Sequence, residues 1–277
     1  MIKTETDARQ AGLGLTQRDL GMLSAMETWG VLGIGQLVGL GLEGTLGVKE
    51  LVERFFNMMD REDYVLGIAK RIYALEAAGY IQGHSYLRQP KAFTVTQKGL
   101  AALADEPETC HPAVRDAVSE ALIKHDLKVS AVGLLLTQLL GLTPRREHPK
   151  AVWTHSHGRR HLILEGAADL VIDSPTEPRY IEVELTQKSK KRYQNIFEAY
   201  RHRVPLGGAV LYMTGWPGGA DVILSNARAQ RAPFVYACSL DEVRASAGRC
   251  LFQGAVPDRT IRLGGRPLVA VPAEVSR

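Results

Sequence analysis

The chain has 277 residues, a length that suggests about two domains, and its 45% hydrophobic and 23% charged residues exclude a disordered chain. Its net charge of +4 is mild, slightly acidic up to residue 105 and basic beyond it, so charge alone does not establish a nucleic-acid partner. The cysteines lack C-x-x-C spacing, the N-terminus lacks a signal-peptide core, and the longest apolar run, residues 131–142, is too short to span a membrane. We therefore expect a cytoplasmic protein without a zinc finger, a disulfide framework or a membrane partner.

Helical patterns dominate the N-terminal part of the chain. Thr16 is placed as an N-cap with Asp19 at the third helical position, and apolar residues continue at helical spacing as far as Val31. Further helical patterns occupy residues 33–40, 51–59 and 64–78. Asp63 is placed to cap the last of these helices, and Gly79 is placed to end it.

Two short strands follow this helical part. Residues 80–81 and 92–95 have strand character, a turn-rich tip lies between them, and Thr96 is placed to cap a helix over residues 97–104. Helices, a two-strand wing and a closing helix are the order of a winged helix-turn-helix. The segments LTQRDL, RIYALEAAGYI and AFTVTQKGLAAL resemble the pieces of such domains, in order. The resemblance predicts a winged helix-turn-helix over residues 15–105 that binds double-stranded DNA.

In such a domain the helix over residues 64–78 is the recognition helix, which enters the major groove, while the wing contacts phosphates. The residues expected to contact DNA are Lys70, Arg71 and Tyr73 on the helix and Arg88 and Lys91 on the wing. An alternative is that Lys70 and Arg71 only form a solvated helix face. The whole order of elements favours DNA contact, although the acids between positions 50 and 63 would repel DNA.

A polar, proline-containing segment over residues 105–112 is the predicted domain boundary. We expect a second domain over residues 112–247 and a C-terminal tail over residues 248–277. Helical patterns in this part cover residues 113–140, 188–203, 220–230 and 240–247, and strand patterns cover residues 151–156, 168–172, 179–185, 209–214 and 234–238. Residues 143–149 and the segment HSHGRRH are expected to be loops, the latter contacting phosphate through Arg159 and Arg160.

Three acids and a lysine gather around a predicted hairpin in the second domain. Asp169 lies on its first strand, and two prolines turn the chain at residues 174–178. Strict alternation then places Glu182 and Glu184 on one face of the second strand, and Lys188 follows at the start of a helix. Carboxylates beside a cation suit phosphodiester cleavage with Mg²⁺, which takes hard oxygen ligands and activates a bound water. The alternative is that both glutamates lie on the solvated face of an edge strand.

This hairpin resembles the core of the PD-(D/E)XK nucleases, which include restriction enzymes, junction resolvases and repair nucleases. The resemblance implies a restriction-endonuclease-like α/β fold in which Asp169 and Glu182 hold Mg²⁺, with Mn²⁺ as a substitute. Glu184 stands where the family has its lysine, so Lys188 would have to replace that lysine from the following helix. The predicted catalytic residues are therefore Asp169, Glu182, Glu184 and Lys188. Without the replacement, the domain would have a nuclease-like fold and no activity.

Three further cations follow Lys188 in the first turns of its helix. Lys190, Lys191 and Arg192 lie where positive charge opposes the helix dipole, which favours an anion such as a DNA phosphate beside them. A solvated basic face is the alternative interpretation.

The full order of elements predicts an α+β protein, with a winged helix-turn-helix followed by a nuclease-like domain. Together with the segment IKHDLKVSAV, it resembles the replication-relaxation family of plasmid and mobile-element proteins over most of residues 15–240. The resemblance implies a role in replication, relaxation or processing of DNA, and two classes of function stay open. One is a Mg²⁺-dependent DNA endonuclease. The other is a non-catalytic accessory factor or transcriptional regulator, whose degenerate nuclease-like domain is a second DNA clamp or a homodimer surface, with replication or mobilisation proteins as partners.

Overall fold

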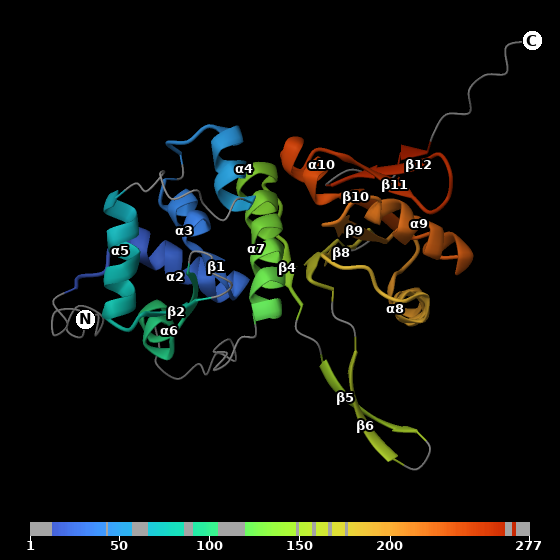
Figure 1. Cartoon of the computed structure of the whole chain (residues 1–277), viewed down its shortest axis with the longest axis horizontal. Coiled ribbons are helices and arrows are strands. Elements are labelled where there is room, and N and C mark those ends of the chain that lie inside the picture. Colours follow the sequence, from blue (N-terminus) through green and yellow to red (C-terminus); the bar gives the residue numbers. More distant parts are fainter. Residues whose placement is uncertain are drawn as a thin grey trace, which may run out of the picture. The chain divides into compact units, whose positions relative to one another are not determined.

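The computed structural model describes residues 13–42, 44–56, 66–85, 91–104, 120–147, 150–156, 159–165, 168–174, 177–263 and 268–269 (Figure 1). It is an α+β protein, as predicted, with an N-terminal helical region that carries a small antiparallel sheet, followed by a larger mixed sheet with helices. The chain forms two compact units that divide within helix α7, between Leu135 and Leu136. We call them the first and the second unit. In the described residues, no helix is long and apolar enough to cross a membrane.

The first unit combines helices with a three-stranded sheet in the order β1-β3-β2. Its elements are α2 (Gln17–Trp29), β1 (Leu32–Gly33), α3 (Ile34–Gly41), α4 (Val48–Phe56), α5 (Leu66–Ala77), β2 (Ile81–His84), β3 (Ala92–Val95), α6 (Gln97–Leu103) and most of α7 (Glu120–Leu140). The predicted wing strands pair antiparallel, with Ile81 opposite Val95. The sequence analysis missed β1, because two residues are too few to show a strand period; Leu32 pairs with Phe93.

Helix caps were the most accurate predictions in this unit. Thr16 and Asp19 form the capping box of α2: Thr16 N donates to Asp19 Oδ2 at 2.6 Å, and Asp19 N donates to Thr16 Oγ1 at 3.3 Å. Thr96 caps α6 by accepting from Gly99 N at 3.1 Å. Gly79 follows α5 with a φ of 78°, a conformation that suits glycine. The predicted cap at Asp63 lies outside the described residues.

Helix α7 was expected to open the second domain, but its residues up to Leu135 belong to the first unit. The buried Gln36 side chain donates to Leu127 O at 2.9 Å, and Ser130 Oγ donates to Val31 O at 2.8 Å. These bonds satisfy polar groups that would otherwise be buried without partners, so they hold α7 in place. The predicted boundary at residues 105–112 lies outside the described residues.

Gly133 permits the close approach of α7 to α2 within the first unit. A Cβ atom added there would lie 2.5 Å from Trp29 Cζ3. We expect Gly133→Ala to lower the free energy of unfolding by about 1–3 kcal/mol through overpacking, as measured by urea denaturation. The matched control is Gly21→Ala, because a Cβ atom on Gly21 in α2 meets no atom within 4 Å. A Gly133→Ala variant as stable as that control would contradict the prediction.

The second unit is built on an eight-stranded sheet in the order β13-β12-β11-β10-β9-β8-β7-β4 (Figure 1). Strands β8, β9 and β10 run parallel to one another, and the other neighbours pair antiparallel. The strands of the second unit are β4 (Arg145–Arg146), β5 (Lys150–Ser156), β6 (Arg159–Glu165), β7 (Leu170–Ile172), β8 (Arg179–Glu184), β9 (Ala209–Thr214), β10 (Val235–Ser239), β11 (Leu251–Gly254), β12 (Arg259–Arg262) and β13 (Leu268–Val269). Its helices are α8 (Lys190–Arg203), α9 (Gly219–Ala229) and α10 (Leu240–Ala245).

Four assignments in the second unit need correction. Residues 143–149, expected as a loop, contain β4, which pairs with β7 at the sheet edge. The strand predicted at residues 151–156 is present as β5, but it pairs with β6 in a separate two-stranded sheet. Strand β6 begins at Arg159, so part of the predicted HSHGRRH loop is strand. The expected tail contributes β11, β12 and β13 to the large sheet. Alternation along one strand does not identify the strand with which it pairs.

Strand β8 lies inside the sheet, between β7 and β9, so it is not an edge strand. Side chains of α8 and α9, including Phe197 and Ile223, join one buried cluster with Tyr180 of β8 and Tyr212 of β9. The interpretation of Glu182 and Glu184 as a solvated edge face is therefore wrong, and both glutamates need partners within the fold.

Candidate acid–lysine site beside strand β8

The structure brings together the hairpin residues that the sequence analysis singled out. Leu170 of β7 pairs with Ile181 of β8, so Asp169, one residue earlier, lies next to Glu182 on the same face of the antiparallel pair. Asp169 Oδ2 accepts a hydrogen bond from Val183 N at 2.7 Å, which fixes this carboxylate against β8. Two carboxylates from separate strands therefore face the same side of the sheet.

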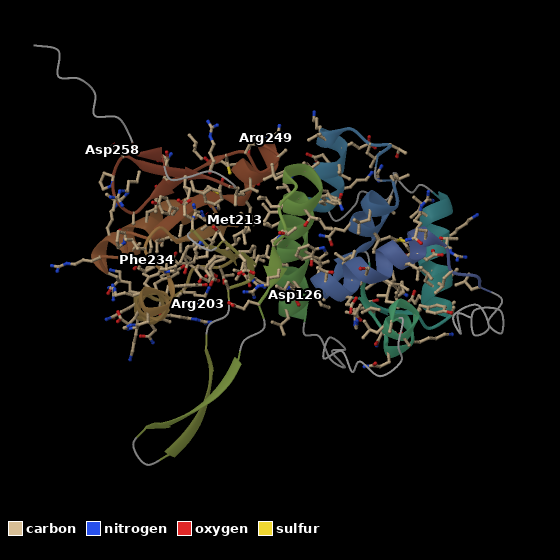
Figure 2. The ribbon with its side chains drawn as sticks, turned by 180° about the vertical axis from the view of Figure 1, so that it is seen from behind. Asp126, Arg203, Met213, Phe234, Arg249 and Asp258 are labelled. Atoms are coloured by element: carbon tan, nitrogen blue, oxygen red, sulfur yellow. The ribbon has the colours of Figure 1, made fainter. Side chains whose placement is uncertain are left out.

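The backbone just before Asp169 is also anchored. Ala168 N donates to Glu147 Oε2 at 3.0 Å, and Glu147 Oε1 forms an ion pair with Arg203 at the end of α8. The guanidinium of Arg203, labelled in Figure 2, lies 4.6 Å from the centroid of the Tyr180 ring. These contacts connect β4, β7 and α8 around the site. None of these contacts was predicted from the sequence.

Glu184 is the most buried acid of the group, only 5% exposed. Its Oε2 atom contacts Lys188 Nζ, so the lysine ammonium lies beside the strand residue two positions after Glu182. Burial lowers the pKa of Lys188, while the charges of Glu182 and Asp169 oppose that shift. The two other carboxylates therefore lie close enough to act on the same ammonium group.

Three buried tyrosines face these charged groups. Tyr200 Oη donates to Glu182 Oε1, and Tyr193 Oη accepts from Lys188 N at 3.1 Å. Tyr212 is paired in register with Glu182 on the neighbouring strand β9. Burial raises the pKa of all three phenols, so they stay protonated at neutral pH. Tyr193 and Tyr200 were predicted on one helix stripe, but their partners, Lys188 N and Glu182, were not predicted.

The donor set bears on the predicted Mg²⁺ site. Among the described residues, no group of three or more His, Cys, Asp or Glu side chains could hold a metal ion. Glu184 contacts Lys188, which leaves Asp169 and Glu182 as the candidate ligands. Mg²⁺ is commonly bound through one or two carboxylates together with waters and substrate phosphates, so this pair is chemically sufficient.

The predicted DNA contacts of the second unit are accessible. Lys190, Lys191 and Arg192 are all exposed in the first turn of α8, directly after its N-cap, Ser189. Ser189 Oγ accepts from Arg192 N at 3.3 Å, which uses one of the helix-end donors. The three cations follow Lys188 in the chain by two to four residues.

The predicted DNA contacts of the first unit that the structure describes are either exposed or paired with an acid. Lys70 and Tyr73 are exposed on α5. Arg71 instead pairs with the fully buried Asp19, its Nε atom 3.0 Å from Oδ1, so it holds α5 to α2. Lys91 Nζ lies 2.9 Å from Glu76 Oε1, which offsets its charge. Arg88 lies outside the described residues.

A scan against protein-family models found no match, and neither did searches of curated proteins and of solved structures.

Proposed function

We propose that this chain is a DNA-binding protein whose second unit cleaves phosphodiester bonds with a divalent cation. The observation that carries the proposal is the Asp169–Glu182 pair on neighbouring strands, with Lys188 held beside it by Glu184. In this proposal the second unit has the restriction-endonuclease-like core, and the first unit is a winged helix-turn-helix. On the basis of the resemblance to replication-relaxation proteins, the proposed biological role is processing of DNA on a bacterial mobile element.

Two features support DNA binding by the first unit. Helix α5 precedes the β2–β3 hairpin, and β1 completes a small antiparallel sheet, as in winged helix domains. The exposed residues Lys70 and Tyr73 give α5 a surface that suits a phosphate and a base edge. Arg71 and Lys91 are left out of this surface, because their charges are paired with Asp19 and Glu76.

The residues of the candidate site have distinct roles in this proposal. Asp169 and Glu182 would hold Mg²⁺ or Mn²⁺, which supplies Lewis acidity and a water of lowered pKa when bound. Lys188 is suited to offset charge on the phosphate through its ammonium group, which contacts Glu184. Glu184 is a positioning residue, since it contacts Lys188 Nζ. Tyr200 orients Glu182 through its hydrogen bond.

Nicking of a supercoiled plasmid tests the cleavage proposal. We expect nicking by the wild type with Mg²⁺ or Mn²⁺ and none in EDTA. Asp169→Asn and Lys188→Ala should each slow it about 100-fold or more, because Asp169 would hold the cation and Lys188 would offset charge in the transition state. Arg249→Ala, which changes an exposed cation of the same unit, is the matched control and should keep the wild-type rate. An inactive wild type that still binds DNA would contradict the proposal.

A specific observation also favours the non-catalytic alternative. Among the described residues there is no group of three or more His, Cys, Asp or Glu side chains that could hold a metal ion. In this alternative the second unit is a DNA clamp that uses the exposed first turn of α8, and the protein is an accessory factor or regulator.

DNA affinity measured over a range of salt concentrations tests the binding surfaces of both units. Lys70→Ala in α5 and the combined Lys190→Ala/Lys191→Ala/Arg192→Ala variant should each weaken binding. The slope of log affinity against log salt should fall by about 0.9 for each phosphate contact removed. Lys49→Ala, which removes an exposed cation on α4, is the control and should bind like the wild type. Unchanged affinity and slope in either variant would exclude that surface.

A further inference from the structure

We propose that Tyr212 is a further residue of the divalent-cation site, whose phenol oxygen accepts a hydrogen bond from a water carried by the cation. This inference rests on the proposed function, because Asp169 and Glu182 are the expected ligands. It adds a residue that the sequence analysis placed only in a buried strand.

The position of Tyr212 is set by the sheet. Strands β8 and β9 run parallel, and Tyr212 is the register partner of Glu182. Partners on adjacent strands share a face, so the phenol lies on the side where Glu182 points. Phe197 of α8 packs edge-on against the Tyr212 ring, with 6.0 Å between the ring centroids. The ring is therefore held in the core, on the face of the sheet that carries Glu182.

Hydrogen bonding distinguishes Tyr212 from the two tyrosines of α8. Tyr200 donates to Glu182, and Tyr193 accepts from the backbone of Lys188. Tyr212 is only 1% exposed, and among the described residues its hydroxyl oxygen has no hydrogen-bond partner. Buried polar groups in native proteins are almost always hydrogen-bonded, so a phenol in this core implies a partner that the protein binds.

The surroundings of Tyr212 identify the class of that partner. Glu182 is the register partner of Tyr212 on β8, and Asp169 lies opposite Glu182 on the far side of β8. A ligand between these groups must therefore satisfy two carboxylates and a neutral phenol at once. A hydrated divalent cation does so, because carboxylates bind the metal while its waters donate hydrogen bonds to neighbouring oxygens.

Mn²⁺ binding, measured by electron paramagnetic resonance of the free ion, tests this assignment. We expect Tyr212→Phe to raise the Kd for Mn²⁺ about 10-fold, within the range found when a residue that supports metal ligands is lost. The control is Tyr236→Phe, which removes the hydroxyl of another buried tyrosine, on β10, and should leave the Kd unchanged. Asp169→Asn should abolish binding and so locate the ion at the site.

The melting temperature in EDTA provides a second readout. Tyr212→Phe should melt at or above the wild-type temperature, because it removes a buried hydroxyl without a protein partner. An unchanged Kd for Mn²⁺ in Tyr212→Phe would overturn the inference. If the melting temperature of that variant were also lower, the role of Tyr212 would be purely structural. If the wild type binds Mn²⁺ and Tyr212→Phe leaves the Kd unchanged, only this inference fails. A wild type that does not bind Mn²⁺ would overturn both this inference and the metal-dependent function.

Discussion

Replacing Lys188 with alanine is expected to lower the free energy of unfolding of the second unit by about 3–5 kcal/mol at neutral pH. Glu184 is 5% exposed, and its Oε2 atom contacts the Lys188 ammonium. Removing that cation leaves a buried carboxylate with an uncompensated charge, which is far less favourable than the original pair. Urea denaturation at pH 7 measures the loss, and plasmid nicking by the same protein below its melting temperature measures the catalytic effect.

The paired variant Glu184→Gln/Lys188→Met separates the stability effect from the catalytic one. It removes both charges at once, so its stability should return close to that of the wild type or exceed it. If Lys188 takes part in cleavage, this stable variant should still be inactive. If Lys188→Ala lowers the free energy of unfolding by less than about 1 kcal/mol, the prediction is wrong. Solvent then screens the Glu184–Lys188 pair as it screens an exposed ion pair.

Replacing Arg71 with alanine is expected to destabilise the first unit by about 3 kcal/mol at pH 7. Asp19 is 0% exposed, and Arg71 donates to it through Nε at 3.0 Å and Nη2 at 2.6 Å. Without Arg71, the bonds from Thr16 alone would have to hold a fully buried carboxylate. Lys70→Ala, one residue away and exposed, is the control and should change stability by less than about 0.5 kcal/mol.

The pH dependence of this effect has a definite sign. Burial raises the pKa of Asp19, but hydrogen bonds from Arg71 and Thr16 outweigh burial, so the pKa of the carboxyl lies below its ordinary value. A carboxyl with a lowered folded-state pKa contributes stability above its unfolded pKa of about 3.9 and loses it as the pH falls through the folded value. The difference between wild type and Arg71→Ala should therefore shrink below about pH 4. A difference that stays constant down to pH 2 would contradict the role of Asp19.

The Arg71 result also bears on the DNA-binding proposal. A variant of Arg71 that binds DNA weakly would not identify a phosphate contact, because the loss of its pair with Asp19 disturbs the packing of α5 on α2. Lys70 is the informative position on this helix, since it is exposed.

The sequence by itself determined the elements whose signals are local. The capping box of α2, the cap of α6 at Thr96 and the glycine that ends α5 were readable because each depends on residues within a few positions. Strand β9 was predicted with its observed bounds, since its apolar run is buried along its whole length. Alternation also placed Glu182 and Glu184 on one face of β8, whereas the contact between Lys188 and Glu184 was not predicted.

Only the tertiary structure decided which segments meet. It placed β4, rather than β5, beside β7, assigned most of α7 to the first unit, and extended the sheet through the expected tail. It paired Arg71, a predicted DNA contact, with Asp19 of α2, and it placed Tyr212 in register with Glu182. Strand register, helix packing and the partners of buried polar groups depend on residues far apart in the chain. Local propensity and periodicity carry no information about such partners, because they reflect only the neighbours along the backbone.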